Sequence, residues 1–183
     1  MNCQVGEMSQ TSAPAKRLSV LRHAKSSWAD TGVPDRERPL APRGRKAARR
    51  IATLLREEGI CPDLVLCSPA ARTTQTLELV RPGLDEGVEV VVEEALYGAA
   101  AGELLDRLRR LPESVGWVMV IGHNPGLQQL VVLLARDGPL RERARAHFPT
   151  AALATMALAE GGWPDLAPGG AVLVSHVAPR DLG

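Results

Sequence analysis

Short apolar runs alternate with longer amphipathic runs along most of this chain, and that alternation narrows the folds that it can adopt. The apolar runs predict β-strands over residues 17–22, 63–68, 88–96 and 117–123. The amphipathic runs predict helices over residues 43–59, from Ser68 onward, over 101–112 and over 124–138. Strands that alternate with helices form a mostly parallel sheet, because each helix carries the chain back along one face of the sheet.

The C-terminal part of the chain breaks this alternation. Residues 151–159 and 169–178 predict two consecutive strands, joined by a loop that contains Gly, Pro and Trp. We therefore expect an α/β fold: a single three-layer α/β/α domain with a mostly parallel central sheet, helices on both faces and a C-terminal antiparallel edge. A length of 183 residues suits one such domain. We expect a disordered leader over residues 1–16, the domain over 17–178 and a tail over 179–183.

The charge balance argues against two classes of partner. Lys and Arg number 22 against 21 Asp and Glu, which gives a net charge of +1. Proteins that bind nucleic acid or a membrane surface through charge need a field of one sign, so we expect neither partner. Aromatic residues make up 3% of the chain, too few for a base-stacking surface. No apolar run reaches the roughly 18 residues of a transmembrane helix. The three cysteines form no Cys-x-x-Cys pair, which favours a cytoplasmic protein without disulfides.

Reactive side chains stand at or just beyond the ends of three predicted strands. These residues are Arg22 and His23, Ser68 and Arg72, and His123 and Asn124. Because the carboxyl ends of parallel strands meet at one edge of a sheet, where α/β proteins bind ligands, we expect one shared site. A metal site would need further ligands, which these positions lack. Arginines around histidines indicate a phosphoryl group instead, since guanidinium N–H groups match two phosphate oxygens. A helix that begins at Ser68 and Pro69 would add backbone N–H donors.

Six motifs in a fixed order resemble the histidine phosphatase superfamily, and in particular its SixA-type phosphohistidine phosphatase branch. The motifs are LRHAKSSW (21–28), RPLAPRG (38–44), DLVLCSPAARTTQT (63–76), EALYGA (94–99), VIGHNPGL (120–127) and FPTAAL (148–153). Together they extend the resemblance over residues 17 to 178. The usual Arg-His-Gly signature of the superfamily reads Arg-His-Ala here, with Ala24 in the third position.

The resemblance implies a role for each site residue. It implies that His23 is the nucleophile, that Arg22 and Arg72 clamp the phosphoryl group, and that His123 completes the phosphate pocket. It places Arg38 and Asn124 among the substrate-binding residues. It also implies no metal and no cofactor. The implied partner is a phosphohistidine protein or a small phosphorylated substrate.

The chemistry of an imidazole nucleophile agrees with this assignment. The ring attacks phosphorus only when it is neutral, and neighbouring arginines lower the pKa of His23 by disfavouring its charged form. Its second ring nitrogen must carry the proton, and we expect a backbone carbonyl to hold it. A general acid is harder to assign, because Asn124 stands where some superfamily members have an Asp. Glu94 is the candidate acid, and a phosphohistidine substrate needs less acid assistance because its P–N bond is labile.

Two other functions stay open at this stage, a phosphatase for small esters and an idle binding module, while a mutase and a thiol nucleophile are disfavoured. The same mechanism could serve a small phosphate ester, whereas a mutase would need insertions for which the chain has little room. A catalytically idle phosphate- or phosphopeptide-binding module would retain the same pocket residues. Cys67 beside Ser68 suggests a thiol nucleophile, but CSPAAR is one residue shorter than a Cys-x5-Arg loop, so we expect a buried cysteine. We expect structural or exposed positions for His147 and His176, and positions over loops or at the site mouth for Trp28 and Trp163.

Overall fold

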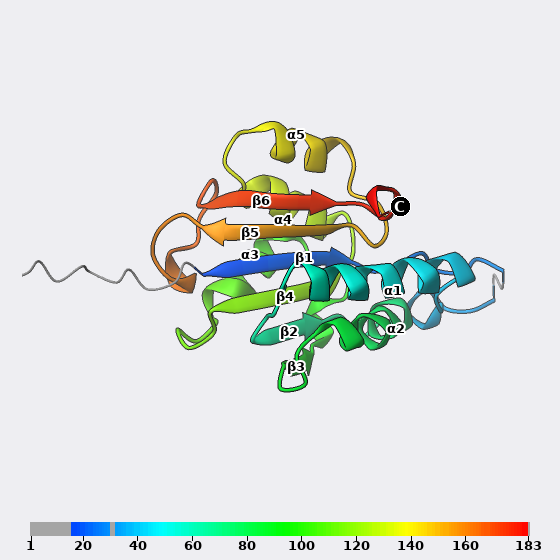
Figure 1. The fold of residues 1–183 in the computed structure, drawn as a ribbon. Coiled ribbons are helices and arrows are strands. Elements are labelled where there is room, and N and C mark those ends of the chain that lie inside the picture. The colour runs from blue at the N-terminus through cyan, green and yellow to red at the C-terminus, as the bar shows by residue number, and fades with distance from the viewer. Residues whose placement is uncertain (1–15, 30–31, 183) are drawn as a thin grey trace, which may run out of the picture.

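A six-stranded sheet organises the protein, whose structure is a computed structural model that describes residues 16–29 and 32–182 (Figure 1). The strand order is β3-β2-β4-β1-β5-β6. The strands are β1 (Arg17–Arg22), β2 (Leu64–Cys67), β3 (Glu89–Val92), β4 (Trp117–Gly122), β5 (Leu153–Leu158) and β6 (Ala171–Val177). β1, β2, β3 and β4 run parallel, β5 runs antiparallel to β1, and β6 runs antiparallel to β5. The predicted mostly parallel sheet with a C-terminal antiparallel edge is confirmed.

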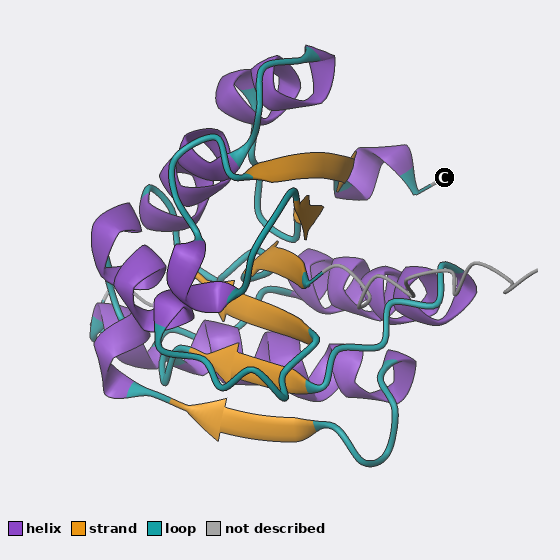
Figure 2. Ribbon diagram, turned by 90° about the vertical axis from the view of Figure 1, so that its left-hand side faces the viewer, coloured by secondary structure: helices purple, strands orange, loops and turns teal. Residues whose placement is uncertain are grey.

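Helices cover both faces of the sheet, so that the strands form a middle layer (Figure 2). The α-helices are α1 (Pro42–Glu57), α2 (Ala71–Val80), α3 (Ala101–Arg109), α4 (Gly126–Leu134) and α5 (Pro139–Ala146). Short 3-10 helices are η1 (Asp35–Glu37), η2 (Arg81–Gly83), η3 (Glu94–Leu96), η4 (Trp163–Asp165) and η5 (Pro179–Asp181). No helix of the described ranges combines the length and the apolar character that crossing a bilayer requires.

Strand periodicity divides the buried residues into two cores. In β4, Val118 and Val120 face one core while Met119 and Ile121 face the other, because successive side chains point to opposite faces of a sheet. α3 and α4 pack on the first face, and α1 and α2 on the second. Strands buried on both faces read as continuous apolar runs, which is why β1, β2 and β4 are recognisable in the sequence.

The connections of β1 and β4 leave the sheet in opposite directions. From β1 the chain passes through α1 to β2, on the far side of β4, whereas from β4 it passes through α4 and α5 to β5, on the far side of β1. Open α/β sheets bind ligands at such a point of divergence, beyond the carboxyl ends of the two neighbouring strands. Arg22, His23 and His123 lie at these two strand ends.

Several element boundaries differ from the predictions. β3 ends at Val92 instead of residue 96, because the chain turns there into η3. α2 begins at Ala71, with Ala70 as its N-cap, so Ser68 and Pro69 do not start the helix. The sequence analysis did not predict α5, whose residues PLRERARA bury Ala144 alone and show little apolar periodicity.

The predicted leader and tail have different outcomes. Residues 1–15 of the leader lie outside the described residues, while the Lys16 carbonyl accepts a hydrogen bond from the Leu158 amide at the end of β5. The expected tail starts with η5, where the Arg143 guanidinium pairs with the Asp181 carboxylate. The limits of the domain therefore stay a prediction at both ends.

Candidate active site

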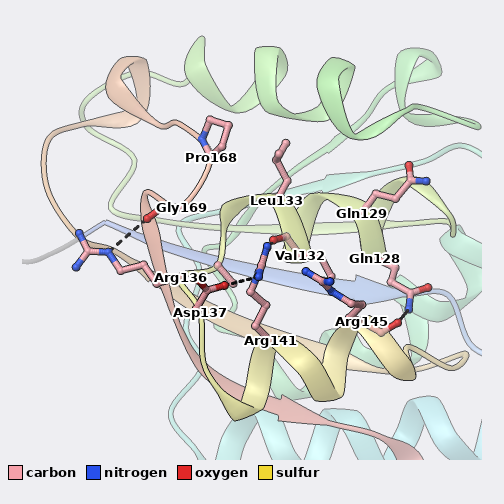
Figure 3. A pocket seen from close by; sticks show the side chains of 11 residues that line it. Gln128, Gln129, Val132, Leu133, Arg136, Asp137, Arg141, Arg145, Pro168 and Gly169 are labelled. Carbon is pink, nitrogen blue, oxygen red and sulfur yellow. Dashed lines mark hydrogen bonds and ion pairs between the residues drawn. The ribbon is translucent and has the colours of Figure 1, made fainter.

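A cavity of about 890 Å³ lies away from the predicted site, between α4, α5 and residues 168–169 (Figure 3). Its three arginines already have partners. Arg136 donates to the Gly169 carbonyl, Arg141 pairs with Asp137, and Arg145 lies 3.7 Å from the Glu142 carboxylate. Among the residues that the structure describes, neither a histidine nor a cysteine lines it. The cavity therefore lacks the groups that the sequence analysis associated with chemistry.

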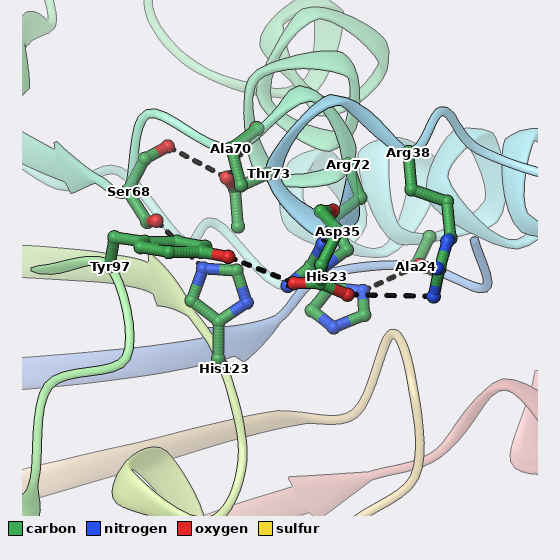
Figure 4. Close-up of polar contacts among 10 residues, drawn as sticks. All are labelled: His23, Ala24, Asp35, Arg38, Ser68, Ala70, Arg72, Thr73, Tyr97 and His123. Carbon is green, nitrogen blue, oxygen red and sulfur yellow. Dashed lines mark hydrogen bonds and ion pairs between the residues drawn. The ribbon is translucent and has the colours of Figure 1, made fainter. Parts of the chain in front are cut away.

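The carboxyl ends of β1, β2 and β4 bring the predicted residues together instead. The ring centroids of His23 and His123 are 5.3 Å apart. Arg72 projects from the first turn of α2 toward both rings, and Arg22 is close enough to interact electrostatically with His23, His123 and Arg72 (Figure 4 shows Arg72 and the two rings). Four residues that span a hundred positions of sequence thus share one buried site.

The ring of His23 is held in a single orientation. Its Nδ1 lies 2.8 Å from the Ala24 carbonyl oxygen, which can only accept, so Nδ1 carries the ring proton (Figure 4). The Ala24 amide in turn donates to Thr76 Oγ1 of α2 at 3.0 Å. The backbone carbonyl predicted to hold the ring is therefore present, and Nε2 is left with its lone pair available for attack.

Burial keeps both imidazoles neutral. Burial lowers the pKa of His23 to about 3, and His123, Arg72 and Arg22 add smaller electrostatic contributions in the same direction. Burial and then Arg72 lower the pKa of His123 to about 4, although Asp35 opposes the shift. The predicted direction for His23 agrees, but burial outweighs the arginines that the sequence analysis named as the cause.

His123 is fixed by Ser68, whose role the sequence analysis missed. Ser68 Oγ lies 2.7 Å from His123 Nε2, and both groups are buried. His123 Nδ1 is buried and has no hydrogen-bond partner among the described residues. The Tyr97 ring meets the His123 ring edge-on, with centroids 5.5 Å apart. The expectation that Ser68 caps a helix is wrong because two residues, Pro69 and Ala70, still separate it from α2, which leaves the hydroxyl free to contact His123.

The two arginines are held by the chain in different ways. Arg22 Nη1 donates to the Phe148 carbonyl at 2.8 Å, while its buried Nε has no partner among the described residues. Arg72 Nη1 donates to the Asp35 carbonyl at 2.6 Å, and its Nη2 donates to the Asp35 carboxylate at 2.9 Å. Burial and then Arg72 lower the pKa of Arg22, which is the cost of placing two guanidiniums side by side.

Asp35 is a second site residue that sequence reasoning missed. Its Oδ2 accepts hydrogen bonds from Arg72 and from the Tyr97 hydroxyl, the latter at 2.9 Å (Figure 4). Burial pushes the pKa of Asp35 upward, but the hydrogen bonds from Tyr97 and Arg72 outweigh it, so the pKa lies below its ordinary value. Asp35 stands in a charged loop rather than at a strand end. The sequence signal that could have indicated Asp35 is its position three residues before Arg38, which the sequence analysis had assigned to the site.

The remaining predicted residues lie at the periphery of this cluster. Arg38 Nη1 is 3.5 Å from Asp35 Oδ1, and its guanidinium stacks 3.7 Å from the centre of the Trp28 ring. Asn124 Nδ2 donates to the Phe148 carbonyl at 3.0 Å, the same oxygen that Arg22 binds. The side chain of Glu94 is 73% exposed and pairs with Arg36. Its assignment as general acid stays a prediction, as do the substrate-binding roles of Arg38 and Asn124.

The other singled-out residues lie in the core or on the surface. Burial raises the pKa of the Cys67 thiol to about 12, in agreement with the expected buried cysteine of β2. Trp163 is fully buried rather than placed over the site, and Trp28 is 63% exposed. His176 is buried against the Phe148 ring, and His147 is exposed. Over residues 16–29 and 32–182, no three His, Cys, Asp or Glu side chains gather in a way that could hold a metal ion.

A parallel sheet that gathers two neutral imidazoles and two guanidiniums at its carboxyl edge defines an α/β enzyme built for phosphoryl groups. Comparison with known proteins narrows this class. The family model of the histidine phosphatase superfamily (branch 1) matches residues 18–117. An uncharacterised Mycobacterium tuberculosis protein is 39% identical over 164 residues, which are 87% of this chain and 100% of that protein. The chain belongs to the histidine phosphatase superfamily.

Solved structures of the SixA type match nearly the whole chain. SixA of Nakamurella multipartitia is 32% identical, with a TM-score of 0.80 over 91% of this chain and 98% of that chain. The protein histidine phosphatase SixA complexed with tungstate is 27% identical, with a TM-score of 0.75 over 91% of this chain and 99% of that chain. The protein is thus a SixA-type histidine phosphatase, an enzyme that hydrolyses phosphoryl groups through a histidine.

Proposed function

We propose that this phosphatase removes the phosphoryl group from phosphohistidine on proteins, through a covalent intermediate on His23 and without a metal ion. One observation carries the proposal: the Ala24 carbonyl holds the proton of the neutral His23 ring on Nδ1, which leaves the Nε2 lone pair available, and two guanidiniums lie close enough to act on this ring electrostatically. The likeness to SixA structures supports the substrate class, because one of them is described as a protein histidine phosphatase.

In the first step, the lone pair of His23 Nε2 attacks phosphorus and the P–N bond to the substrate imidazole breaks. Arg22 and Arg72 neutralise charge on the equatorial oxygens, which is the main task of the protein in phosphoryl transfer. The buried Nδ1 of His123 faces the same region and donates to a phosphoryl oxygen when the Ser68 hydroxyl donates to Nε2. The departing imidazole leaves as a neutral ring when its other nitrogen carries a proton, so it needs little help from an acid.

In the second step, water attacks the phosphorus of the phosphoenzyme and the bond from phosphorus to His23 Nε2 breaks. Inorganic phosphate leaves, and the His23 lone pair is restored. A neutral imidazole is again the leaving group, and the depressed pKa of His23 keeps it neutral throughout the physiological range. The same two arginines stabilise both transition states, since each has the same trigonal phosphoryl group at its centre.

Turnover of a phosphohistidine peptide tests the proposal, with p-nitrophenyl phosphate as a parallel substrate and EDTA in the buffer. We expect wild type to hydrolyse the peptide, and His23→Ala to lose at least about a thousandfold in rate, since the nucleophile is removed. Radiolabel from the peptide should be trapped on His23 in wild type and absent from the variant.

Two results would contradict the proposal. Comparable rates in wild type and His23→Ala would exclude His23 as nucleophile. Rapid hydrolysis of the ester with none of the peptide would replace the protein substrate with a small-molecule ester. Unchanged circular dichroism and thermal unfolding of the variant would show that lost activity does not come from lost fold.

A further inference from the structure

A second cavity, of about 590 Å³, carries a charge pattern that the phosphate chemistry does not use. It lies between α1, the segment that joins α5 to β5, and the turn that follows β6. Six basic side chains line this basic groove: Lys25, Arg43, Lys46, Arg50, His147 and Arg180. Asp and Glu are absent from its lining within the described ranges. For a protein whose net charge is +1, this is a strong local concentration of one sign.

Four of the basic side chains of the groove are not neutralised by the described residues, whereas Arg180 lies 3.9 Å from the Asp181 carboxylate. In the part of the chain that the structure describes, Lys25, Arg43, Lys46 and Arg50 form no ion pair and no side-chain hydrogen bond. The arginines of the cavity in Figure 3, by contrast, are paired with carboxylates or a carbonyl. Unpaired like charges in one concave surface repel one another, and an anionic ligand relieves that repulsion.

The basic groove adjoins the phosphate pocket along the chain and in space. Lys25 follows His23 by two residues, a separation of at most roughly 7 Å along the backbone. The Ala151 amide, next to the groove residue Thr150, donates to the carbonyls of Arg22 and His23 at 3.1 and 3.0 Å. β6 runs parallel to β1, so the two strands end at the same edge of the sheet (Figure 1). His23 directly follows β1 and Arg180 lies in η5 just after β6, so both residues belong to that edge. A ligand whose phosphoryl group reaches His23 can therefore continue into the groove.

We propose that the basic groove binds an acidic segment of the substrate protein that flanks its phosphohistidine. This inference rests on the proposed function, because it names which phosphohistidine proteins the enzyme prefers. The groove runs along α1 from Arg43 to Arg50, which is about 10 Å at the rise of an α-helix and matches about three residues of extended peptide. The preferred substrate carries Asp or Glu about two to five residues from the phosphohistidine, in an extended segment.

Kinetics on three synthetic phosphohistidine peptides test the proposal. The peptides share one length and differ only in flanking residues, which are acidic, neutral or basic. For wild type we expect kcat/KM to fall from the acidic to the neutral to the basic peptide, with at least about a tenfold difference between the extremes. Added salt should shrink that difference, because it screens the attraction.

Charge reversal of groove residues on α1 is the second test of the proposal. Lys46→Glu with Arg50→Glu should lower kcat/KM on the acidic peptide by at least about tenfold and leave p-nitrophenyl phosphate turnover unchanged. The matched control is Arg49→Glu with Arg56→Glu, which makes the same change in net charge at exposed positions of α1 outside the groove. If charge reversal impairs folding, the neutral variant Lys46→Gln with Arg50→Gln tests the same proposal, and its kcat/KM on the acidic peptide should also fall.

Each outcome separates this proposal from the proposed function. Equal turnover of the three peptides by wild type, with activity that depends on His23, would overturn the groove proposal and leave the phosphatase assignment intact. A loss in the control pair equal to that in the groove pair would also overturn it, because the effect would then be one of net charge. Loss of peptide hydrolysis in wild type would contradict the proposed function instead.

Discussion

The Ser68 hydroxyl contacts Nε2 of His123 and thereby sets the protonation of the other ring nitrogen, Nδ1. Ser68 Oγ binds His123 Nε2 at 2.7 Å, and nothing else among the described residues binds that ring through a hydrogen bond. Ser68→Ala should therefore reduce kcat by about tenfold or more without unfolding the protein, because the ring loses the contact that sets its tautomer. The ring-nitrogen NMR shifts of His123 should change as well, which a merely structural role would not produce.

Rescue by a conservative variant checks the assignment of Ser68. Ser68→Thr retains the hydroxyl and should recover most of the activity that Ser68→Ala loses. A Ser68→Ala enzyme with wild-type kcat and unchanged His123 shifts would show that the hydrogen bond does not position the ring.

Asp35 places a negative charge where an oxyanion must approach. Its carboxylate accepts hydrogen bonds from the Arg72 guanidinium and the Tyr97 hydroxyl, beside the two imidazoles. Asp35→Asn removes the charge but keeps a group of the same shape, so inorganic phosphate should inhibit the variant about three- to tenfold more tightly. Inhibition constants at neutral pH measure this directly.

Glu94→Gln is the matched control for Asp35→Asn. It also neutralises a carboxylate that pairs with an arginine, but Glu94 is mostly exposed and contacts neither imidazole. Its phosphate inhibition should stay as in wild type. Weaker inhibition of Asp35→Asn would mean that Asp35 serves phosphate binding by orienting Arg72, and that repulsion is the smaller effect.

At the scale of elements, the start of α1 packs through a glycine against the segment that follows His23. A Cβ added at Gly44 would lie 2.2 Å from the Lys25 carbonyl oxygen, closer than any real contact. Gly44→Ala would gain up to about 1 kcal/mol in helix propensity. The overlap with backbone costs about 1–3 kcal/mol and outweighs this gain, so the free energy of unfolding should fall.

Gly102→Ala in α3 is the matched control for Gly44→Ala, because it changes helix propensity without creating a steric overlap. Nothing lies within 4 Å of a Cβ added at Gly102, so helix propensity acts alone and the free energy of unfolding should rise by a few tenths of a kcal/mol, up to about 1. Urea unfolding of both variants measures the two signs. A stabilised Gly44→Ala would show that α1 can move away from Lys25 at little cost.

The elements that the sequence predicted best are those whose own residues determine them. β1, β2 and β4 are buried on both faces and read as apolar runs, and the site residues at their ends follow from the rule that parallel strands end at one edge. α5 escaped prediction because its packing depends on one buried alanine, Ala144. Such a helix is set by its neighbours, and no periodicity in its sequence reveals it.

The candidate site, like the fold, could be predicted from the sequence only in part. Arg22, His23, Arg72 and His123 lie at or near strand ends and could be found from local sequence. Ser68 was found at a strand end in the same way, but its contact with His123 was not, and Asp35 was not found at all, because these contacts cross from one element to another. Asp35 reaches Arg72 from a loop 37 residues earlier, and Ser68 reaches His123 across 55 residues. Those separations depend on tertiary packing, which a linear pattern does not encode.

For the molecule as a whole, the buried site sets the pH range in which the fold is stable. The pKa values of His23 and His123 are lowered to about 3 and about 4, while the unfolded chain has ordinary histidines near 6.5. Below about pH 6.5 the unfolded chain binds protons at these two histidines, whereas the native protein does not until the pH approaches their lowered pKa values. The free energy of unfolding therefore falls as the pH falls. At high pH the buried Cys67 thiol, with its pKa raised to about 12, destabilises the fold above about pH 9.

His176 is a third buried histidine whose pKa is lowered, but we assign most of the acid side of this dependence to His23 and His123 of the candidate site. Each one costs up to about 1.4 kcal/mol per pH unit below 6.5 until its native pKa is reached. Urea unfolding at about pH 7.5 and about pH 5.5 should therefore show wild type losing roughly 1–3 kcal/mol. His23→Gln with His123→Gln should lose much less between the same two pH values, whatever its absolute stability, since His176 of β6 is then the one buried histidine with a lowered pKa left among the described residues. His147→Gln, at an exposed histidine, is the control and should keep the wild-type slope. If the double variant keeps that slope too, the acid sensitivity arises elsewhere, and the buried imidazoles do not govern the stability of the fold.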